Sequence, residues 1–269
     1  MTALCGLSGV SRATYYRSLK VRSGDEQECD LRDEIEKIAL EWEYYGSRRI
    51  HQELIRRGWE VGRQRVQRIV RENGLLCLRR PTRWLTTTDS KHGLPVYPNL
   101  VGEWRPTAIN QLWVTDVTYI RLRSSFVFLA ALLDGFSRRV IGWALDQHFR
   151  AELCIQALEM ALAARHFPQG VIHHSDRGVQ YCSKEYRALL EKYALRGSMA
   201  RKGNPYDNAI AESFWKTLKY EQVYRHQYRT IEEARANIGL FIEQVYNHRR
   251  LHSALSYVPP VEYERTAAK

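Results

Sequence analysis

The segment that most constrains the fold of this 269-residue chain is Leu112–Ile120, a run of β-branched and aromatic residues with an aspartate at its centre. Such a run favours a buried strand, from which aspartate is normally depleted. A charge buried at Asp116 is costly unless it has a partner or a metal ion. The segment therefore predicts a strand that carries a functional acid.

Two further acidic residues lie where a carboxylate can serve a site. Asp176 ends the short apolar run Gly170–Ser175, and in open α/β sheets ligands gather at the carboxyl ends of strands. Thirty-five residues, 177–211, separate it from Glu212, which lies in a predicted helix. Glu212 taken alone fits an ordinary solvated helix face, but together with both aspartates it fits a catalytic site.

The helix that carries Glu212 is predicted from its caps and its apolar spacing. Asn204 suits the N-cap and Pro205 suits the first helical position. A stripe with four-residue spacing faces the core and consists of Ile210, Phe214 and Leu218. At roughly 100° per residue, the residues that project on the opposite, exposed face are Asn208, Glu212, Trp215 and Lys219.

Charge and composition indicate the kind of partner. The net charge of +11 and the pI of about 9.5 favour a polyanion, and residues 44–91 hold 12 Lys and Arg against 4 Asp and Glu. The five scattered cysteines fit reduced packing residues. No apolar run of about eighteen residues and no signal peptide is visible. We therefore expect a cytoplasmic protein, associated with the nucleoid when it is bound to DNA.

Residues 1–78 are predicted to be helical and to bind DNA. Residues 3–20 have the pattern of a short helical hairpin, which fits either part of a helix-turn-helix or an ordinary hairpin. A helix follows over 30–43 with Leu31, Ile35, Ile38 and Leu40 on its apolar side, and two short helices end at Gly58 and near Gly74. Each of these two has an apolar face and a cationic face, as a helix-turn-helix requires. A solvated helix pair is the alternative. The expected DNA contacts are Arg48, Arg49, Arg63, Arg65 and Arg68.

Residues 79–109 lack a steady period and predict a linker, whereas residues 110–269 predict a catalytic α/β domain. Strands are expected over 110–122, 125–134, 138–146, 170–175 and 195–199. Helices are expected over 151–166, 183–193 and 231–248, besides the Glu212 helix. Asp134 precedes a glycine between two strands and is interpreted as a turn residue. His173 and His174 fit either the site or packing within the core.

Carboxylates from two strands and a helix can hold two Mg²⁺ ions, which prefer oxygen ligands. Such a pair promotes in-line displacement at phosphorus. The sequence also contains longer motifs around these acids, and they are Trp113-Thr115-Asp116-Thr118-Tyr119, His174-Ser175-Asp176-Arg177-Gly178-Gln180-Tyr181, Asn204-Pro205-Tyr206-Asp207-Asn208-Ala209-Glu212-Ser213-Phe214-Lys219-Glu221 and Tyr246-Asn247-Arg250-His252-Leu255-Pro259.

Through these motifs nearly the whole chain resembles the integrase-type DDE transposases of bacterial insertion sequences, in particular the second-frame (OrfB) product of family three. The resemblance implies an RNase H-like, retroviral-integrase-like catalytic core behind the helix-turn-helix region. It implies Asp116, Asp176 and Glu212 as ligands of two Mg²⁺ ions, for which Mn²⁺ can substitute. It also implies Lys219 as a DNA contact. Further contacts are expected from Arg201, Lys202, Asn208 and Arg250.

The implied activity is cleavage of DNA at the element's ends and transfer of the resulting 3′-hydroxyl to another phosphodiester. The expected partners are double-stranded DNA from the terminal inverted repeats and the target, further copies of the chain, and a first-frame protein fused by frameshift. Two alternatives stay open. One is a simple RNase H-like nuclease with the same metals, and the other is an inactive or domesticated sequence-specific DNA-binding regulator.

Overall fold

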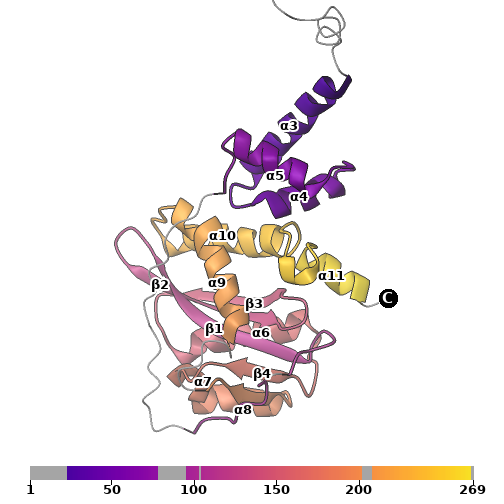
Figure 1. Cartoon of the computed structure of the whole chain (residues 1–269). Coiled ribbons are helices and arrows are strands. Elements are labelled where there is room, and N and C mark those ends of the chain that lie inside the picture. Colours follow the sequence, from indigo (N-terminus) through magenta and orange to yellow (C-terminus); the bar gives the residue numbers. More distant parts are fainter. Residues whose placement is uncertain (1–22, 78–94, 103, 202–207, 268–269) are drawn as a thin grey trace, which may run out of the picture. The chain divides into compact units, whose positions relative to one another are not determined.

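The computed structural model describes residues 23–77, 95–102, 104–201 and 208–267 (Figure 1). The predicted hairpin at 3–20, Lys202, and Asn204 with Pro205 lie outside these residues. The chain divides into two compact units between Arg80 and Pro81, and each is described by itself. Within the described part of the chain, no helix is both long and apolar enough to cross a membrane.

The first unit consists of α3 (Ser23–Glu41), α4 (Ser47–Arg56) and α5 (Arg63–Glu72). The two predicted short helices are confirmed, and the glycines that follow them, Gly58 and Gly74, have positive φ angles of 87° and 66°, the left-handed conformation common after a helix end. The first helix begins earlier than predicted. Its apolar side is buried at Leu31, Ile35 and Ile38, but Leu40 is exposed, because it lies about 200° around the helix from Ile38.

The second unit is built on a five-stranded sheet. Its strands are β1 (Leu112–Arg121), β2 (Phe126–Asp134), β3 (Val140–Asp146), β4 (Ile172–Ser175) and β5 (Arg196–Met199), in the spatial order β3-β2-β1-β4-β5. The first three pair antiparallel, and β4 and β5 run parallel to β1. All five predicted strands are confirmed.

Helices cover both faces of this sheet (Figure 1). One face packs against α6 (Ala151–Ala164), the short and unpredicted α7 (Val179–Cys182), and α8 (Lys184–Lys192). The other packs against α9 (Ala209–Glu221), η2 (Val223–Arg225), α10 (Ile231–Leu240) and η3 (Phe241–Tyr246). Strand β2 shows why: Ala130 and Leu132 enter the first cluster, whereas Leu129 enters the second, since side chains alternate along a strand.

Close packing of α6 on the sheet depends on one glycine. A Cβ atom at Gly142 would lie 2.2 Å from the carbonyl oxygen of Ala157. The strand therefore presents bare backbone where α6 crosses it.

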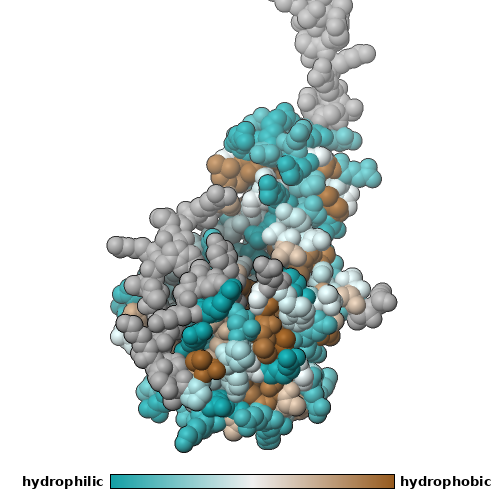
Figure 2. Space-filling view, turned by 60° about the horizontal axis from the view of Figure 1, so that its bottom comes forward, coloured by the Kyte–Doolittle hydropathy of each residue, from teal (hydrophilic) through white to brown (hydrophobic). Residues whose placement is uncertain are grey.

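Outside the core, the face in Figure 2 is mostly hydrophilic, with apolar residues in separate small patches.

The segment predicted as a linker is partly attached to the sheet. The Leu100 backbone N–H donates to Ser198 Oγ at 2.9 Å, and the Met199 N–H donates to the Pro98 carbonyl at 3.4 Å. A Cβ atom at Gly197 would meet the Tyr97 ring at 2.6 Å. Residues 97–100 therefore cover the outer strand β5.

Of the described cysteines, Cys154 and Cys182 are buried as expected, but Cys29 is exposed.

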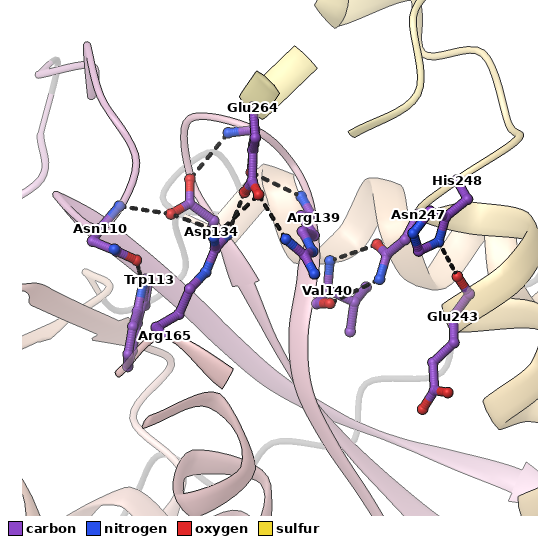
Figure 3. Close-up of polar contacts among 11 residues, drawn as sticks. Asn110, Trp113, Asp134, Arg139, Val140, Arg165, Glu243, Asn247, His248 and Glu264 are labelled. Atoms are coloured by element: carbon purple, nitrogen blue, oxygen red, sulfur yellow. Dashed lines mark hydrogen bonds and ion pairs between the residues drawn. The ribbon is translucent and has the colours of Figure 1, made fainter. Parts of the chain in front are cut away.

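The predicted helix over 231–248 is observed as α10 followed by the π-helical η3. The next residue, Asn247, pairs with the edge of β3 through its side-chain amide. Its Oδ1 accepts from the Val140 N–H at 3.0 Å, and its Nδ2 donates to the Val140 carbonyl at 2.9 Å (Figure 3). Because unpaired strand edges invite association, this contact protects the outer strand. The 3₁₀ turn η4 (Ser253–Leu255) and α11 (Pro260–Ala267) follow and were not predicted.

A buried charge cluster fixes α11 to the sheet (Figure 3). Glu264 accepts from Ser137 Oγ at 2.6 Å and from Arg139 Nη1 at 2.8 Å, and it also contacts the guanidinium of Arg165. Asp134 accepts from the backbone N–H groups of Asn110 and of residues 136 and 137. Its predicted role in the turn is therefore confirmed.

Replacing Glu264 tests this cluster. Burial alone would raise the pKa of Glu264, but hydrogen bonds from Arg165 and Ser137 outweigh burial and hold the pKa below its ordinary value of 4.5. The carboxylate thus stabilises the fold above about pH 4.5, and this stabilisation is lost as the pH falls through the lowered pKa. We expect Glu264→Gln to reduce the free energy of unfolding by roughly 3–5 kcal/mol at pH 7.

Denaturant unfolding at pH 7 and pH 4 measures this difference. The exposed residue Glu232 on α10 supplies the control, because Glu232→Gln should change stability by no more than about 0.5 kcal/mol. A Glu264→Gln protein as stable as the unsubstituted protein at pH 7 would contradict the role of the cluster.

Candidate active site and DNA-binding surface

The register of the parallel pair β1 and β4 brings the two aspartates together. Leu112 lies opposite Ile172 and Val114 lies opposite His174. Extending that register by two residues places Asp116 opposite Asp176, which directly follows β4. Neighbouring strands are about 4.8 Å apart, so the two carboxylates extend from adjacent backbones on one face of the sheet.

Asp116 is held on both of its oxygens. Oδ1 accepts from the Val117 backbone N–H at 2.8 Å, and Oδ2 accepts from Trp215 Nε1 at 3.0 Å. Burial, followed by the charge of Asp176, raises the pKa of Asp116 to about 7, with a smaller contribution from Glu212. Like charges therefore surround this carboxylate, and a bound cation would relieve their repulsion.

The loop after β4 orients Asp176. Its Oδ1 accepts from the Gly178 backbone N–H at 3.0 Å. A Cβ atom at Gly178 would lie 3.0 Å from the same oxygen. The glycine therefore permits the close approach that directs this carboxylate.

Glu212 lies in the first turn of α9, which begins at Ala209 with Asn208 as its N-cap. The predicted N-cap, Asn204, lies outside the described residues. Of the predicted apolar stripe, Phe214 and Leu218 are buried. Burial also raises the pKa of the half-buried Glu212.

The face of α9 predicted to be exposed is not open to solvent. Asn208 and Trp215 are buried, and Lys219 is half-buried. The reason is that this face packs toward β1: Trp215 contacts Asp116, and Lys219 Nζ lies 4.8 Å from the centre of the Tyr119 ring. Burial lowers the pKa of Lys219, and the charge of Asp116 acts against that shift.

The donor chemistry of the three acids fits Mg²⁺, a hard cation that prefers oxygen ligands. Asp116 and Asp176 form the centre of the group, and Glu212 lies one helical turn before the tryptophan that holds Asp116. Among the residues that the structure describes, no three acidic, histidine or cysteine side chains converge closely enough to form a preformed metal site. The structure therefore brings the two aspartates together and leaves Glu212 beside them.

The neighbouring histidines belong to the core. The Tyr186 hydroxyl lies 2.9 Å from His173 Nε2, and Ser198 Oγ lies 2.9 Å from His174 Nδ1. Burial, with a smaller effect of His174, lowers the pKa of His173 to about 3. Of the two roles left open by the sequence, the structure shows packing and hydrogen bonding.

Arg250, whose predicted DNA contact stays a prediction, pairs with Glu221 within the second unit. Its side chain is buried, with Nε and Nη2 donating to Glu221 at 2.7 and 2.6 Å. This bidentate pair ties the segment after η3 to the end of α9. Arg201 is exposed.

The five arginines of the first unit that are predicted to contact DNA differ in their partners. Arg48 and Arg63 are exposed, as a DNA-binding surface requires. Arg65 and Arg68 are also exposed, but they contact Glu28 of α3, with Arg68 Nη2 at 2.7 Å from its Oε1. Arg49 lies over the Tyr45 ring at 5.4 Å. Glu28 is 37 residues before Arg65 and 40 before Arg68, so the pattern of their own helix indicates only a cationic face and not this partner.

Family models match both units. The model "Integrase core domain" matches residues 106–205, a second model of that description matches residues 193–260, and "HTH-like domain" matches residues 26–83. These matches and the α/β sheet confirm the expected RNase H-like integrase core and the helix-turn-helix-like region.

Similar proteins extend over nearly the full length. The chain is 40% identical over 264 residues to "Insertion element IS600 uncharacterized 31 kDa protein" of Shigella sonnei, covering 97% of each chain. It is 34% identical over 268 residues to "Transposase InsF for insertion sequence IS3A" of Escherichia coli K12, covering 97% of this chain and 93% of the relative.

Among solved structures, the HTLV-2 integrase catalytic core domain in complex with magnesium aligns with a TM-score of 0.47 and 16% identity, covering 60% of this chain and 99% of that one. The simian T-cell lymphotropic virus intasome aligns with a TM-score of 0.49 and 14% identity, covering 86% and 74%. The near full-length similarity to InsF, together with the matched models, shows that this chain belongs to the insertion-sequence transposase family with an integrase core.

Proposed function

We propose that this chain is a DNA transposase that cleaves DNA at the ends of an insertion sequence and joins the released 3′-hydroxyl to target DNA. The observation that carries the proposal is the pairing of Asp116 with Asp176 on adjacent strands, with Glu212 on the neighbouring helix. This arrangement lies within a chain of the insertion-sequence transposase family. No observation favours the inactive regulator or the simple nuclease.

The acidic residues Asp116, Asp176 and Glu212 would hold two Mg²⁺ ions, with Mn²⁺ as a substitute. When bound, the ions would activate the attacking oxygen and stabilise the leaving oxygen. The chain's own contribution is orientation: the strand pair fixes both aspartates, and hydrogen bonds fix the Asp116 carboxylate. No side chain needs to act as the nucleophile.

Two successive displacements at phosphorus account for the reaction. Water first breaks a phosphodiester bond and leaves a 3′-hydroxyl at the element's end. The oxygen of that hydroxyl then forms a bond to a target phosphorus, and the target's own 3′-oxygen leaves. Lys219 lies beside Asp116 and is proposed to contact DNA near the reacting phosphate.

The first unit is proposed to bind the terminal repeats. The exposed guanidinium groups of Arg48 and Arg63 would contact phosphates, as cationic helix faces do in helix-turn-helix proteins. We retain residues 1–78 as the DNA-binding region, 79–109 as the connection and 110–269 as the catalytic region. The proposed assembly contains several copies of the chain, because the two ends must be brought together, and includes a first-frame partner.

Removing one carboxylate charge tests the catalytic assignment. We expect Asp176→Asn to reduce the rate of strand joining by roughly 10³-fold or more, because loss of a metal ligand removes several kcal/mol of transition-state stabilisation. A gel assay with labelled terminal DNA and Mn²⁺ measures joined products. Asp146→Asn, at the end of β3, is the matched control and should join normally. Asp176→Asn should still bind the terminal DNA. Undiminished strand joining by this variant would refute the assignment of Asp176 as a metal ligand.

Removing an exposed arginine tests the DNA-binding surface. We expect Arg63→Ala to weaken binding to terminal DNA and to reduce the slope of log K against log salt by about 1, because one phosphate contact is lost. Titrations at several salt concentrations measure this slope. Arg229→Ala removes an exposed positive charge from the other unit and serves as the control. Identical slopes for the two variants would contradict a specific role of Arg63.

Glu28 provides the converse test. It pairs with Arg65 and Arg68, so Glu28→Gln should free both guanidinium groups for phosphates. We expect tighter binding to DNA and a salt slope steeper by up to about 2. The same titrations measure the change, with Glu60→Gln as the control at a residue outside α3. Unchanged binding by a folded Glu28→Gln protein would show that Arg65 and Arg68 serve only to hold the helices together.

A further inference from the structure

The indole of Trp215 links α9 to Asp116, a candidate metal ligand. Nε1 donates to Asp116 Oδ2 at 3.0 Å, and the two residues are 99 positions apart in the sequence. The ring is only 7% exposed and packs against Phe214 with 4.8 Å between ring centres. The donor is therefore held in place by the core and not by a mobile surface side chain.

Hydrogen-bond counting shows what this contact does to the carboxylate. An ionised carboxylate has about four lone-pair positions. The Val117 N–H takes one on Oδ1, and the Trp215 N–H takes one on Oδ2. Both oxygens are thereby fixed, and roughly two positions remain for other ligands.

The chemical nature of the donor also matters. A lysine or arginine at this position would neutralise Asp116 and compete with a cation for the same carboxylate. An indole N–H is a donor only and carries no net charge. It therefore stabilises the ionised carboxylate and leaves its charge available to a metal ion.

Trp215 also connects Asp116 to the helix that bears the third acid. Glu212 precedes Trp215 by three residues, and residues three apart are neighbours on a helix surface. One turn later, Lys219 Nζ lies over the Tyr119 ring of β1. The contacts of Trp215 and Lys219 thus hold the Glu212-bearing face of α9 against β1 at two points.

We propose that Trp215 is a positioning residue that orients the Asp116 carboxylate for metal binding and sets the place of Glu212 beside it. The inference rests on the proposed transposase function. Beyond that function, the inference is that a neutral hydrogen-bond donor outside the acidic triad orients the residues of the metal site. Loss of the partners that orient metal ligands typically costs 10–100-fold in metal affinity or activity.

The test compares Trp215→Phe with the unsubstituted protein. Phenylalanine keeps an aromatic ring in the core but lacks the N–H group. Trp143→Phe is the matched control, because Trp143 Nε1 likewise donates to a carboxylate, that of Glu243, at 3.3 Å. We expect Trp215→Phe to bind Mn²⁺ roughly 10–100-fold more weakly in calorimetric titrations without DNA, and we expect Trp143→Phe to bind it normally.

Strand joining as a function of Mn²⁺ concentration gives a second readout. In Trp215→Phe the half-saturating Mn²⁺ concentration should rise by a similar factor, and excess Mn²⁺ should partly restore the rate. A folded Trp215→Phe protein with unchanged Mn²⁺ affinity would overturn the proposal. If the unsubstituted protein forms no joined product, the proposed function fails, but the calorimetric comparison still decides the role of Trp215.

The unsubstituted protein supplies a measurement that does not depend on the folding of Trp215→Phe. With ¹⁵N in the tryptophan indoles, Mg²⁺ should shift the N–H resonance of Trp215 and leave that of Trp143 unchanged. Asp116→Asn should abolish the shift. A Trp215 resonance that does not respond to Mg²⁺, in a protein that calorimetry shows to bind the ion, would also overturn the proposal.

Discussion

The candidate active site depends on core packing that holds two like-charged carboxylates together, that of Asp116 within β1 and that of Asp176 directly after β4. Their proximity follows from the strand register, which is fixed by the apolar residues buried on both faces of the sheet. A slip of one residue would move Asp116 to the opposite face. Core packing therefore overcomes the repulsion between Asp116 and Asp176, and the resulting site is one that a divalent cation would stabilise.

The C-terminal segment supports this site from outside. Arg250 holds the last turn of α9 through Glu221, while Asn247 pairs with the edge of β3. Tyr246 packs edge-on against Phe214, the neighbour of Trp215. The terminal motif, which resembles that of the transposase family, therefore has a structural role in these contacts: it holds the helix that carries Glu212.

Local patterns predicted most of the fold. Alternation and apolar runs located the strands. Asp116 was identified because an aspartate is unusual within a buried strand, and Asp176 because ligands gather at strand ends. The partners of polar side chains were not predictable in this way. Trp215 and Asp116 are 99 positions apart, Arg250 and Glu221 are 29, and Arg68 and Glu28 are 40. Residues paired over such distances look like exposed side chains when only their own helix is considered.

Partners that are distant in the sequence also change how the basic charge of the first unit should be interpreted. Arg65 and Arg68 share Glu28, and Arg57 contacts Glu34 and two further glutamates. When DNA replaces a carboxylate at such a guanidinium, one anion is exchanged for another, and the net gain is small. Arg63 is exposed and has no acidic partner among the residues that the structure describes. Such an arginine exchanges water and counterions, whose release favours binding. The strength of DNA binding therefore depends on which arginines lack an acidic neighbour more than on the total positive charge.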